Sequence, residues 1–531
     1  MLTKNSGKAA TMFLCPRKLI FLFIWINALG IIFLSSAKTA EEWKTRIIYQ
    51  ILTDRFAPSG SLPTVKCTDM RGWCGGTFKG IQNHLDYITG LGANAIWISP
   101  IVLNTDKGFH GYWAKNIYEI ESHFGTKEEL KSLVSACHER DVWVMVDVVA
   151  NHMGYPPGTN WNTPWNSTLF DRFYENLYPF NRSEYYHPNH PWIKWPEECH
   201  DLKKLQEYWL ANLPDLNQSH PYVEKTLLHW IQYLVNEYDF DGCRVDTVIQ
   251  VPKPFWTKFQ KAGKVFMLGE ANIGPPPCCT LNFTASFQGP LNSVLDFPLF
   301  WTNRYIFQEK KQNFLSLSKY LKDSAKGFLD SSVLGVFIDN HDHARFLYMN
   351  PSYVTLRNNL VYLLMSRGIP LLYYGTEQGF NGGDDPNNRE SLWPYMNTSH
   401  VLYTFIKHLI KVRKDQGNDW LKTDQIERYV TPNVYSFSRG KLLIIITTAN
   451  STTTAKIQSH PYKSGQNLKN LLNQKQMFKV SSNGSWLQDC RMTNESIENK
   501  FNYTLTCLHP LSLAKSKPSM ESKKCILIER F

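Results

Sequence analysis

Short apolar runs alternate with longer amphipathic stretches through the middle of the chain. Three of those stretches, Lys127–Arg140, Tyr222–Tyr238 and Ser352–Arg367, repeat apolar residues at the spacing of one helix face. Eight strands separated by helices are typical of a parallel α/β barrel, so the pattern predicts a (β/α)8 TIM barrel. The apolar runs that we expect to form its strands are Ile47–Phe56, Ala95–Ile101, Val142–Val149, Phe240–Val245, Val265–Gly269, Ser293–Phe297, Val333–Ile338 and Pro370–Tyr374.

Two regions depart from this alternation. Residues 152–220 are rich in Pro, Asn, Trp and Tyr without a sustained period, which indicates an irregular insertion after the third strand, and long connections of this kind are usually functional. After about Asp419 the pattern changes to short β-like runs, among them Val434–Ser438 and Leu442–Thr448. We therefore expect a TIM-barrel catalytic domain over 41–151 and 221–420, an insertion domain over 152–220 and a small all-β C-terminal domain, a β-sandwich, over 421–531.

The first 40 residues have the pattern of a targeting segment. Arg17 and Lys18 precede an apolar run, Leu19–Leu34, and small residues follow it, as in a secretory signal peptide. The run is shorter than the about 20 residues that a membrane span needs. A signal anchor stays open as the alternative because the polar stretch before Arg17 is long. We expect a protein that is secreted through the secretory pathway and that can be associated with the cell surface or cell wall. We expect contact with the membrane only if this segment is uncleaved.

Composition narrows the class of ligand. The chain has 57 basic and 46 acidic residues and a formal charge of +11, but five of the basic residues and no acid precede Glu41. No dense basic stripe occurs in the remainder, so we expect no nucleic-acid partner. The aromatic fraction is 14%, with 17 Trp and 26 Tyr. Sugar rings stack on flat aromatic side chains, so this excess favours a carbohydrate ligand.

The eleven cysteines fit an oxidising compartment. Cys67 and Cys74 flank a Gly/Trp turn, so we expect a local bridge between them. Cys137 and Cys243 lie inside apolar patterns and are expected to be buried thiols. Asn-x-Ser/Thr sequons are dense, which agrees with a secreted glycoprotein. A bridge that pins the last domain is expected among the C-terminal cysteines Cys490, Cys507 and Cys525.

Polar residues stand where four of the predicted strands end. The carboxyl ends of barrel strands converge on one mouth, where barrel enzymes carry their active sites, so the carboxyl groups of Asp246, Glu270 and Asp342 are expected to meet there. The strand ends concerned are Val146–His152, Asp241–Asp246, Leu268–Asn272 and Phe337–Asp342.

Three carboxylates at one mouth fit either a metal site or the cleavage of a glycosidic bond. Cleavage needs one carboxylate that attacks the sugar or activates water and one carboxylic acid that protonates the leaving oxygen, and a separation of about 5–5.5 Å gives retention of configuration. Arg244 lies two residues before Asp246 on the same strand face and would hold it ionised. Glu270 must instead stay protonated, which burial and its anionic neighbours would favour.

Short motifs from about Arg46 to at least Arg389 match, in collinear order, the pattern of one family. They are Asp147–His152, Gly242–Asp246, Gly269–Glu270, Asn340–Asp342, Leu213–Leu216, Arg46–Tyr49, Thr53–Phe56, Cys74–Thr77 and His110–Trp113. The sequence resembles the α-amylase family, glycoside hydrolase family thirteen, and most of all the secreted fungal-type α-amylases. The resemblance implies a retaining hydrolase that cleaves internal α-1,4-glucosidic bonds of starch- or glycogen-like α-glucans through a covalent intermediate on Asp246. We expect it to act as a monomer.

The resemblance also implies roles for individual residues. Asp246 is the nucleophile, Glu270 the general acid/base, and Asp342 the residue that grips the hydroxyls of the distorted sugar. The other substrate-binding positions, which include hydrogen-bond donors, stacking rings and an outer clamp, are His110, Tyr112, Trp113, His152, Arg244, Gly274, His341, Asp385 and Arg389.

A calcium ion that joins the insertion to the barrel follows from the same resemblance. Asn151 and Asp215 would give side-chain oxygens, and Glu197 and Gln250 would give backbone carbonyls. Ligation by oxygen alone suits a hard cation such as Ca²⁺. The ion would fix the insertion against strand three and so build one wall of the cleft.

Two departures from the family pattern stand out. After Asp246 the fungal amylases usually carry a Lys-His pair that reaches the leaving-group side, where this chain has Ile249-Gln250. Cys199 matches a family cysteine, but His190 stands near the place of its partner, so we expect that bridge to be absent. The first departure keeps open a 4-α-glucanotransferase acting on cell-wall α-glucan. A catalytically silent glycan-binding homologue is a further alternative, which the presence of all three carboxylates disfavours.

Overall fold

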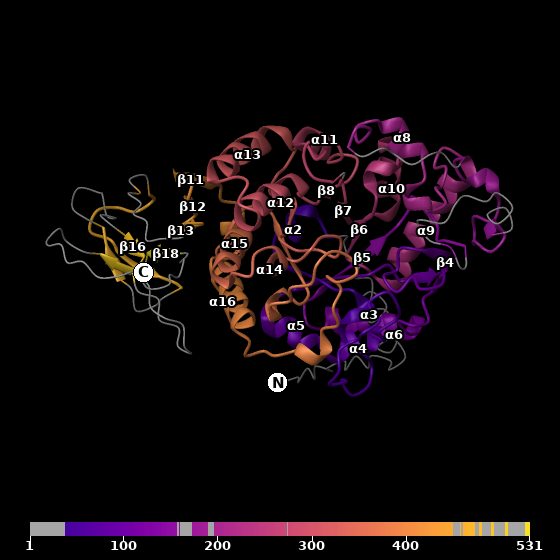
Figure 1. The fold of residues 1–531 in the computed structure, drawn as a ribbon, viewed down its shortest axis with the longest axis horizontal. Coiled ribbons are helices and arrows are strands. Elements are labelled where there is room, and N and C mark those ends of the chain that lie inside the picture. The colour runs from indigo at the N-terminus through magenta and orange to yellow at the C-terminus, as the bar shows by residue number, and fades with distance from the viewer. Residues whose placement is uncertain are drawn as a thin grey trace, which may run out of the picture.

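The computed structural model describes residues 38–530 outside the segments 157–158, 160–172, 189–195, 273, 450–456, 458–459, 473–476, 481–489, 493–504 and 508–525. Figure 1 shows a large helix-coated barrel and, beside it, a smaller group of strands from the C-terminal part of the chain. The predicted targeting segment lies outside the described residues up to Ala37. Among the helices of the described residues, none combines the length and the apolar character needed to cross a bilayer.

Eight parallel strands form the centre of the larger body. They are β1 (Ile48–Gln50), β2 (Ala95–Ile98), β5 (Trp143–Val148), β6 (Gly242–Val245), β7 (Phe266–Gly269), β8 (Ser293–Val294), β9 (Gly335–Val336) and β10 (Ile369–Tyr373). Their order in the sheet is β8-β7-β6-β5-β2-β1-β10-β9. A parallel bridge between Leu295, directly after β8, and Gly335 in β9 joins the two ends. The predicted TIM barrel is confirmed.

Helices cover the outside of this barrel (Figure 1). The three predicted helices are present, and their ends follow from local chemistry. The helix at Lys127–His138 starts in a capping box between Thr126 and Glu129, and the one at Pro221–Tyr238 has proline in its first turn, where no N–H is needed. The main helices are α5 (Leu85–Leu91), α6 (Lys127–His138), α9 (Pro221–Tyr238), α10 (Lys253–Gly263), α12 (Phe297–Asn303), α13 (Phe314–Gly327), α15 (Tyr353–Met365) and α16 (Val401–Asp415).

Several predicted strands end earlier than expected, and in two of them a helix begins within the predicted run. The first run stops as a strand at Gln50, and Thr53–Phe56 forms the short helix α3. The sixth run stops at Val294, because Asp296 caps α12 by accepting a hydrogen bond from the Leu299 N–H (3.1 Å). Pro298, in the first turn of α12, has no N–H to give to a sheet.

The insertion is fastened to the barrel at both of its ends. The Met153 N–H donates to the Pro214 carbonyl (3.0 Å), and the Leu216 N–H donates to the Asn151 carbonyl (2.8 Å). Its described part contains the short helix α8 (Leu202–Glu207) and the 3-10 turns η1 (Ser183–Tyr185) and η2 (Leu210–Asn212). Before it, a hairpin of β3 (Val102–Asn104) and β4 (Ala114–Ile120) leads back to the barrel.

One disulfide corrects the sequence prediction. Cys199, for which we considered only a partner near His190 and expected that bridge to be absent, is bonded to Cys278 in the segment after β7, 79 residues further along the chain. The sequence motif indicates only a partner inside the insertion, whereas in the fold the segment after β7 lies against the insertion. The predicted Cys67–Cys74 bridge is present, and Cys137 and Cys243 are buried free thiols as predicted.

The C-terminal part is all-β, as predicted. Strands β11 (Gln425–Val430), β12 (Val434–Arg439), β13 (Leu442–Thr447), β18 (Ile526–Arg530), β14 (Asn467–Asn470) and β15 (Met477–Lys479) form one antiparallel sheet in that order. A second pair, β16 (Cys490–Met492) and β17 (Leu505–Cys507), places Cys490 opposite Cys507. The sheet meets the barrel helices at α15, where the Thr447 N–H donates to the side chain of Asn358 (2.9 Å).

Candidate active site

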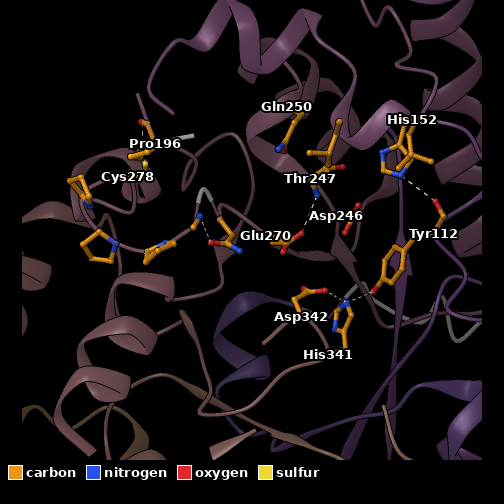
Figure 2. Close-up of a pocket in the computed structure, with 17 residues that line it drawn as sticks. Tyr112, His152, Pro196, Asp246, Thr247, Gln250, Glu270, Cys278, His341 and Asp342 are labelled. Carbon is orange, nitrogen blue, oxygen red and sulfur yellow. Dashed lines mark hydrogen bonds and ion pairs between the residues drawn. The ribbon is translucent and has the colours of Figure 1, made fainter. Parts of the chain in front are cut away.

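A cavity of about 780 Å³ opens at the carboxyl ends of the barrel strands, where the residues that follow β6, β7 and β9 come together (Figure 2). The three predicted carboxylates lie in it, although they are far apart along the chain. The predicted site residues that line the cavity are Tyr112, His152, Asp246, Gln250, Glu270, Gly274, His341 and Asp342.

Arg244 lies beneath the cavity with a side chain that is 1% exposed, and it binds three carboxylates. Its Nη1 is 2.6 Å from Asp246 Oδ1 and 3.0 Å from Asp147 Oδ1, and its Nη2 is 2.7 Å from Glu270 Oε2. A guanidinium is planar and binds carboxylates with fixed geometry. Because its two terminal nitrogens bind different acids, Arg244 holds Asp246 and Glu270 side by side.

The backbone of the barrel fixes the same two acids. The Asp246 N–H donates to the Val148 carbonyl (2.9 Å), and the Glu270 N–H donates to the Val245 carbonyl (2.8 Å), so each acid continues the ladder of its strand. Thr247 then adopts a left-handed backbone with φ of 47°, which is rare for a β-branched residue. This bend turns the Thr247 N–H towards Glu270 Oε2, 3.3 Å away. Strain of this kind clusters at functional sites.

The environments of Glu270 and Asp342 shift the pKa values of these two acids in opposite directions. Burial raises the pKa of Glu270 well above that of an ordinary glutamate; Arg244 opposes the shift, and the charges of Asp246 and Asp342 add to it. Burial would also raise the pKa of Asp342, but His341 and Arg389 outweigh it and hold that pKa below its usual value. A carboxylic acid and a carboxylate therefore stand in one cavity, the arrangement that acid/base chemistry needs.

His341 is a neutral donor aimed at the cavity. Burial lowers its pKa to about 4. The Gln50 side-chain amide donates to His341 Nδ1 (2.8 Å), which leaves the ring proton on Nε2. Nε2 lies 3.0 Å from the Tyr112 hydroxyl and 3.3 Å from Asp342 Oδ1, and the Tyr112 hydroxyl donates to Asp147 Oδ2 (2.7 Å). Tyr112 thus connects Asp147 to His341.

The remaining predicted substrate-binding residues surround this cavity without lining it. His110 is buried, and its Nδ1 accepts the Tyr112 N–H (3.1 Å), while the Trp113 ring packs edge-on against it. Arg389 lies on the Asp342 side, with Nη2 3.6 Å from Asp342 Oδ1 and Nη1 3.1 Å from Asp385 Oδ1. The Asp385–Arg389 pair therefore continues the site outward from Asp342.

Of the two residues that depart from the family's Lys-His pair, only Gln250 faces the cavity. Ile249 is fully buried in the core. The Gln250 Oε1 is buried and has no hydrogen-bond partner. This side chain therefore brings an open hydrogen-bonding group to the position of the histidine in the family's Lys-His pair.

Two of the residues expected to hold calcium present buried oxygens that have no hydrogen-bond partner. Asn151 Oδ1 and Asp215 Oδ1 are both buried without a hydrogen-bond partner, while Asp215 Oδ2 accepts from His187 Nδ1 (2.7 Å). Burial raises the pKa of Asp215 to about 7. Within the described residues no group of three or more His, Cys, Asp and Glu side chains is arranged for a metal. Two open oxygens from the barrel and the insertion nevertheless fit a hard cation completed by backbone carbonyls.

Several residues of the site were not predicted from the sequence. Asp147 was part of a quoted motif, but nothing in the pattern indicated that it shares Arg244 with Asp246. The proline run after β7 carried a visible signal, three consecutive prolines close behind Glu270. The unpredicted lining residues are Pro196, Leu210, Leu213, Thr247, Asn272, Pro275, Pro276, Pro277 and Cys278.

Comparison with known proteins agrees with this geometry. The sequence profile of the alpha-amylase catalytic domain matches residues 50–392. The chain is 37% identical over 404 residues to alpha-amylase 2 of Schizosaccharomyces pombe (73% of this chain, 66% of that relative). It is 35% identical over 392 residues to alpha-amylase 1 of Lipomyces kononenkoae (71% of this chain, 59% of that relative). The matched regions thus span about two thirds or less of these relatives' own lengths.

A solved structure extends the likeness to the fold. The alpha-amylase of Malbranchea cinnamomea superposes with a TM-score of 0.79 at 29% identity, over 93% of this chain and 98% of that one. The profile match covers most of the barrel, and the strand-end carboxylates lie in one cavity as the family pattern requires. This chain belongs to the alpha-amylase family.

Proposed function

We propose that this protein is a retaining glycoside hydrolase that cleaves internal α-1,4-glucosidic bonds of starch- or glycogen-like α-glucans. The observation that carries the proposal is the Arg244 guanidinium, which binds Asp246 at 2.6 Å and Glu270 at 2.7 Å through separate nitrogens. Two carboxyl groups bound to one guanidinium lie side by side, as retaining enzymes need, in which the two groups are about 5–5.5 Å apart and one attacks the sugar directly.

In the first step Asp246 attacks the anomeric carbon while Glu270 gives its proton to the glycosidic oxygen. The bond from that carbon to the leaving oxygen breaks, and the leaving chain departs with a new hydroxyl. Because Arg244 and the Thr247 N–H both bind Glu270 Oε2, we assign the transferable proton to Oε1. In the second step Glu270 takes a proton from water, whose oxygen attacks the anomeric carbon and releases Asp246 with net retention.

The other side chains act on the sugar that carries the reacting carbon. Asp342, held ionised, would accept hydrogen bonds from its hydroxyls and stabilise positive charge near the ring. His341 and His152, both with pKa values lowered by burial, would donate as neutral imidazoles. Tyr112 would stack on the sugar ring, and His110 and Trp113 would support Tyr112. Gly274 would leave room for substrate at the rim of the cavity. Asp385 and Arg389 would bind the next sugar unit outward.

We further propose that Asn151 and Asp215, with the carbonyls of Glu197 and Gln250, hold a calcium ion. When bound, the ion would supply a fixed charge that joins the insertion to the barrel. The catalytic steps are carried out by the side chains of the protein. We also propose secretion of a glycosylated monomer, with the cell wall as one place of action, which the two disulfides among the described residues support.

The alternatives are less well supported than hydrolysis. The named relatives are alpha-amylases, which favours hydrolysis over glucan transfer. A silent binding protein would not need a buried arginine that holds two acids, since keeping such a network buried is costly without a function.

The test is product analysis with defined maltooligosaccharides. Proton NMR of the first products should show the α-anomer at the new reducing end, and a fluorinated maltosyl fluoride should leave an ester on Asp246 that peptide mass spectrometry locates. Asp246→Asn should lower kcat by about 10³-fold or more. Asp241→Asn, the same change at the other end of β6, is the matched control and should keep turnover. A β-anomer as first product, or an adduct elsewhere, would contradict the proposal.

A further inference from the structure

The cavity has an apolar wall that the mechanism above does not use. We call it the proline wall, and it consists of Pro196, Leu210, Leu213, Pro275, Pro276 and Pro277. In Figure 2, Pro196 and Cys278 lie on one side of Glu270, Asp246 and Tyr112 lie on the other, and Asp342 and His341 lie below it. Pro196 of the proline wall therefore lies across Glu270 from Asp246 in this view, and the rest of the wall lines the same cavity.

This position identifies which part of a substrate the wall meets. If the proposed function holds, the sugar that is attacked sits beside Asp246 and Asp342, and Glu270 protonates the oxygen of the departing chain. The departing chain must then extend past Glu270, which is the direction of the proline wall. Pyranose rings present apolar C–H faces that can pack on the apolar wall. Ligand pockets combine an apolar lining with a few polar groups, which here are Gln250 and Asn272.

The wall is rigid by its covalent chemistry. Pro275, Pro276 and Pro277 are exposed, so their rings are available to a ligand, and each ring fixes its own φ. Gly274 begins the run with a φ of 85°, in the left-handed region where a side chain is disfavoured, and its N–H is held by Asn272 Oδ1 (3.0 Å). A surface that is already ordered loses little entropy when it binds.

The two halves of the wall come from different parts of the chain and are joined by the Cys199–Cys278 disulfide. Pro196, Leu210 and Leu213 belong to the insertion, whereas the three prolines follow β7. Beside the disulfide, His200 Nε2 lies 2.8 Å from the Cys278 carbonyl oxygen and forms a second link. The disulfide therefore sets the distance between the two halves.

We propose that the proline wall binds the glucose units of the leaving chain, and that the Cys199–Cys278 disulfide is a positioning device that holds this leaving-group site in shape. The inference rests on the proposed hydrolase function and adds to it the residues that select the leaving group. It also accounts for the loss of the family's Lys-His pair, since a preformed apolar surface beside Gln250 takes the place of charged contacts.

The test compares two substrates that share the attacked sugars and differ in the leaving group. Maltohexaose can place glucose units on the wall, whereas maltosyl fluoride releases only fluoride, which cannot reach it. In the full chain, Cys199→Ser combined with Cys278→Ser should lower kcat/KM for maltohexaose by about tenfold and change kcat/KM for maltosyl fluoride less than about twofold. Cys67→Ser combined with Cys74→Ser, which removes a disulfide away from the cavity, should affect both substrates equally.

A second variant keeps the proposal testable if the protein without the Cys199–Cys278 disulfide does not fold. Pro276→Ala removes part of one exposed ring and should lower the maltohexaose-to-fluoride ratio of kcat/KM in the same direction. An unchanged ratio in both variants, with active wild-type enzyme, would overturn the wall assignment and leave the hydrolase function intact. Wild-type enzyme that turns over neither substrate would overturn the hydrolase function, and the wall assignment with it.

Discussion

Arg244 Nη1 lies 2.6 Å from Asp246 Oδ1, where Arg244 is in β6 and Asp246 is the residue directly after that strand. Alternate residues of a strand point to the same face, so one strand and the residue that follows it supply both the attacking carboxylate and the cation paired with it. The same guanidinium binds Glu270, the residue directly after β7, so Arg244 lies at the centre of the site.

Arg244→Lys should therefore impair catalysis more than folding. A lysine keeps the charge but cannot bind two acids through a planar fork, so we expect kcat/KM for maltooligosaccharides to fall by about 10²-fold or more. Arg439→Lys, at a buried arginine of the domain junction, is the matched control and should change the melting temperature without a comparable loss of kcat/KM. Equal losses of activity in the two variants would argue against a special role for Arg244.

Glu270 should set the alkaline limit of activity. The proton that it donates is present below its pKa, and burial raises that pKa well above that of an ordinary glutamate. Activity should therefore persist towards neutral pH and fall as the pH rises through the pKa of Glu270. In Glu270→Gln we expect the alkaline limb to disappear from the residual turnover of maltosyl fluoride. A limb that stays at the same pH in this variant would assign it to another group.

Calcium should stabilise the native protein through Asn151 and Asp215. A ligand present at a hundredfold excess over its Kd adds about 2.7 kcal/mol to the free energy of unfolding. We expect a chelator to lower the melting temperature of the wild type measurably, and Asp215→Asn to lower it and to abolish the response to chelator. Asp296→Asn, a second buried carboxylate, is the control that should keep the response. No chelator effect on the wild type would contradict the calcium assignment.

Trp420 should hold the C-terminal sheet against the barrel. It lies in α17 (Asn418–Leu421), its indole N–H donates to the Arg439 carbonyl (2.8 Å), and the Arg439 guanidinium lies 4.0 Å from its ring. Arg439 also donates to the Ser366 carbonyl after α15. Trp420→Ala should cost about 3–5 kcal/mol of unfolding free energy, measured by denaturant titration, with kcat/KM at 25 °C nearly unchanged. Unaltered stability would show that the junction does not depend on this ring.

The sequence by itself determined the barrel, its order of strands along the chain and the acids at the strand ends. Apolar runs and helical periods are local signals that predict the strands and helices. Because all strands of such a barrel end at one mouth, their order alone predicts that Asp246, Glu270 and Asp342 lie close together. The predicted Cys67–Cys74 bridge was local in the same sense, since its two residues are seven positions apart.

Only the tertiary structure decided which distant segments touch. Cys199 pairs with Cys278 because the insertion folds over the segment after β7, and no period in the sequence records that contact. The same holds for Asp147, which shares Arg244 with Asp246 across two strands, and for Ile249, whose burial leaves Gln250 alone to face the cavity. The physical reason is that a pattern along the chain specifies which face of an element is buried, whereas the partner on that face is chosen by packing in three dimensions.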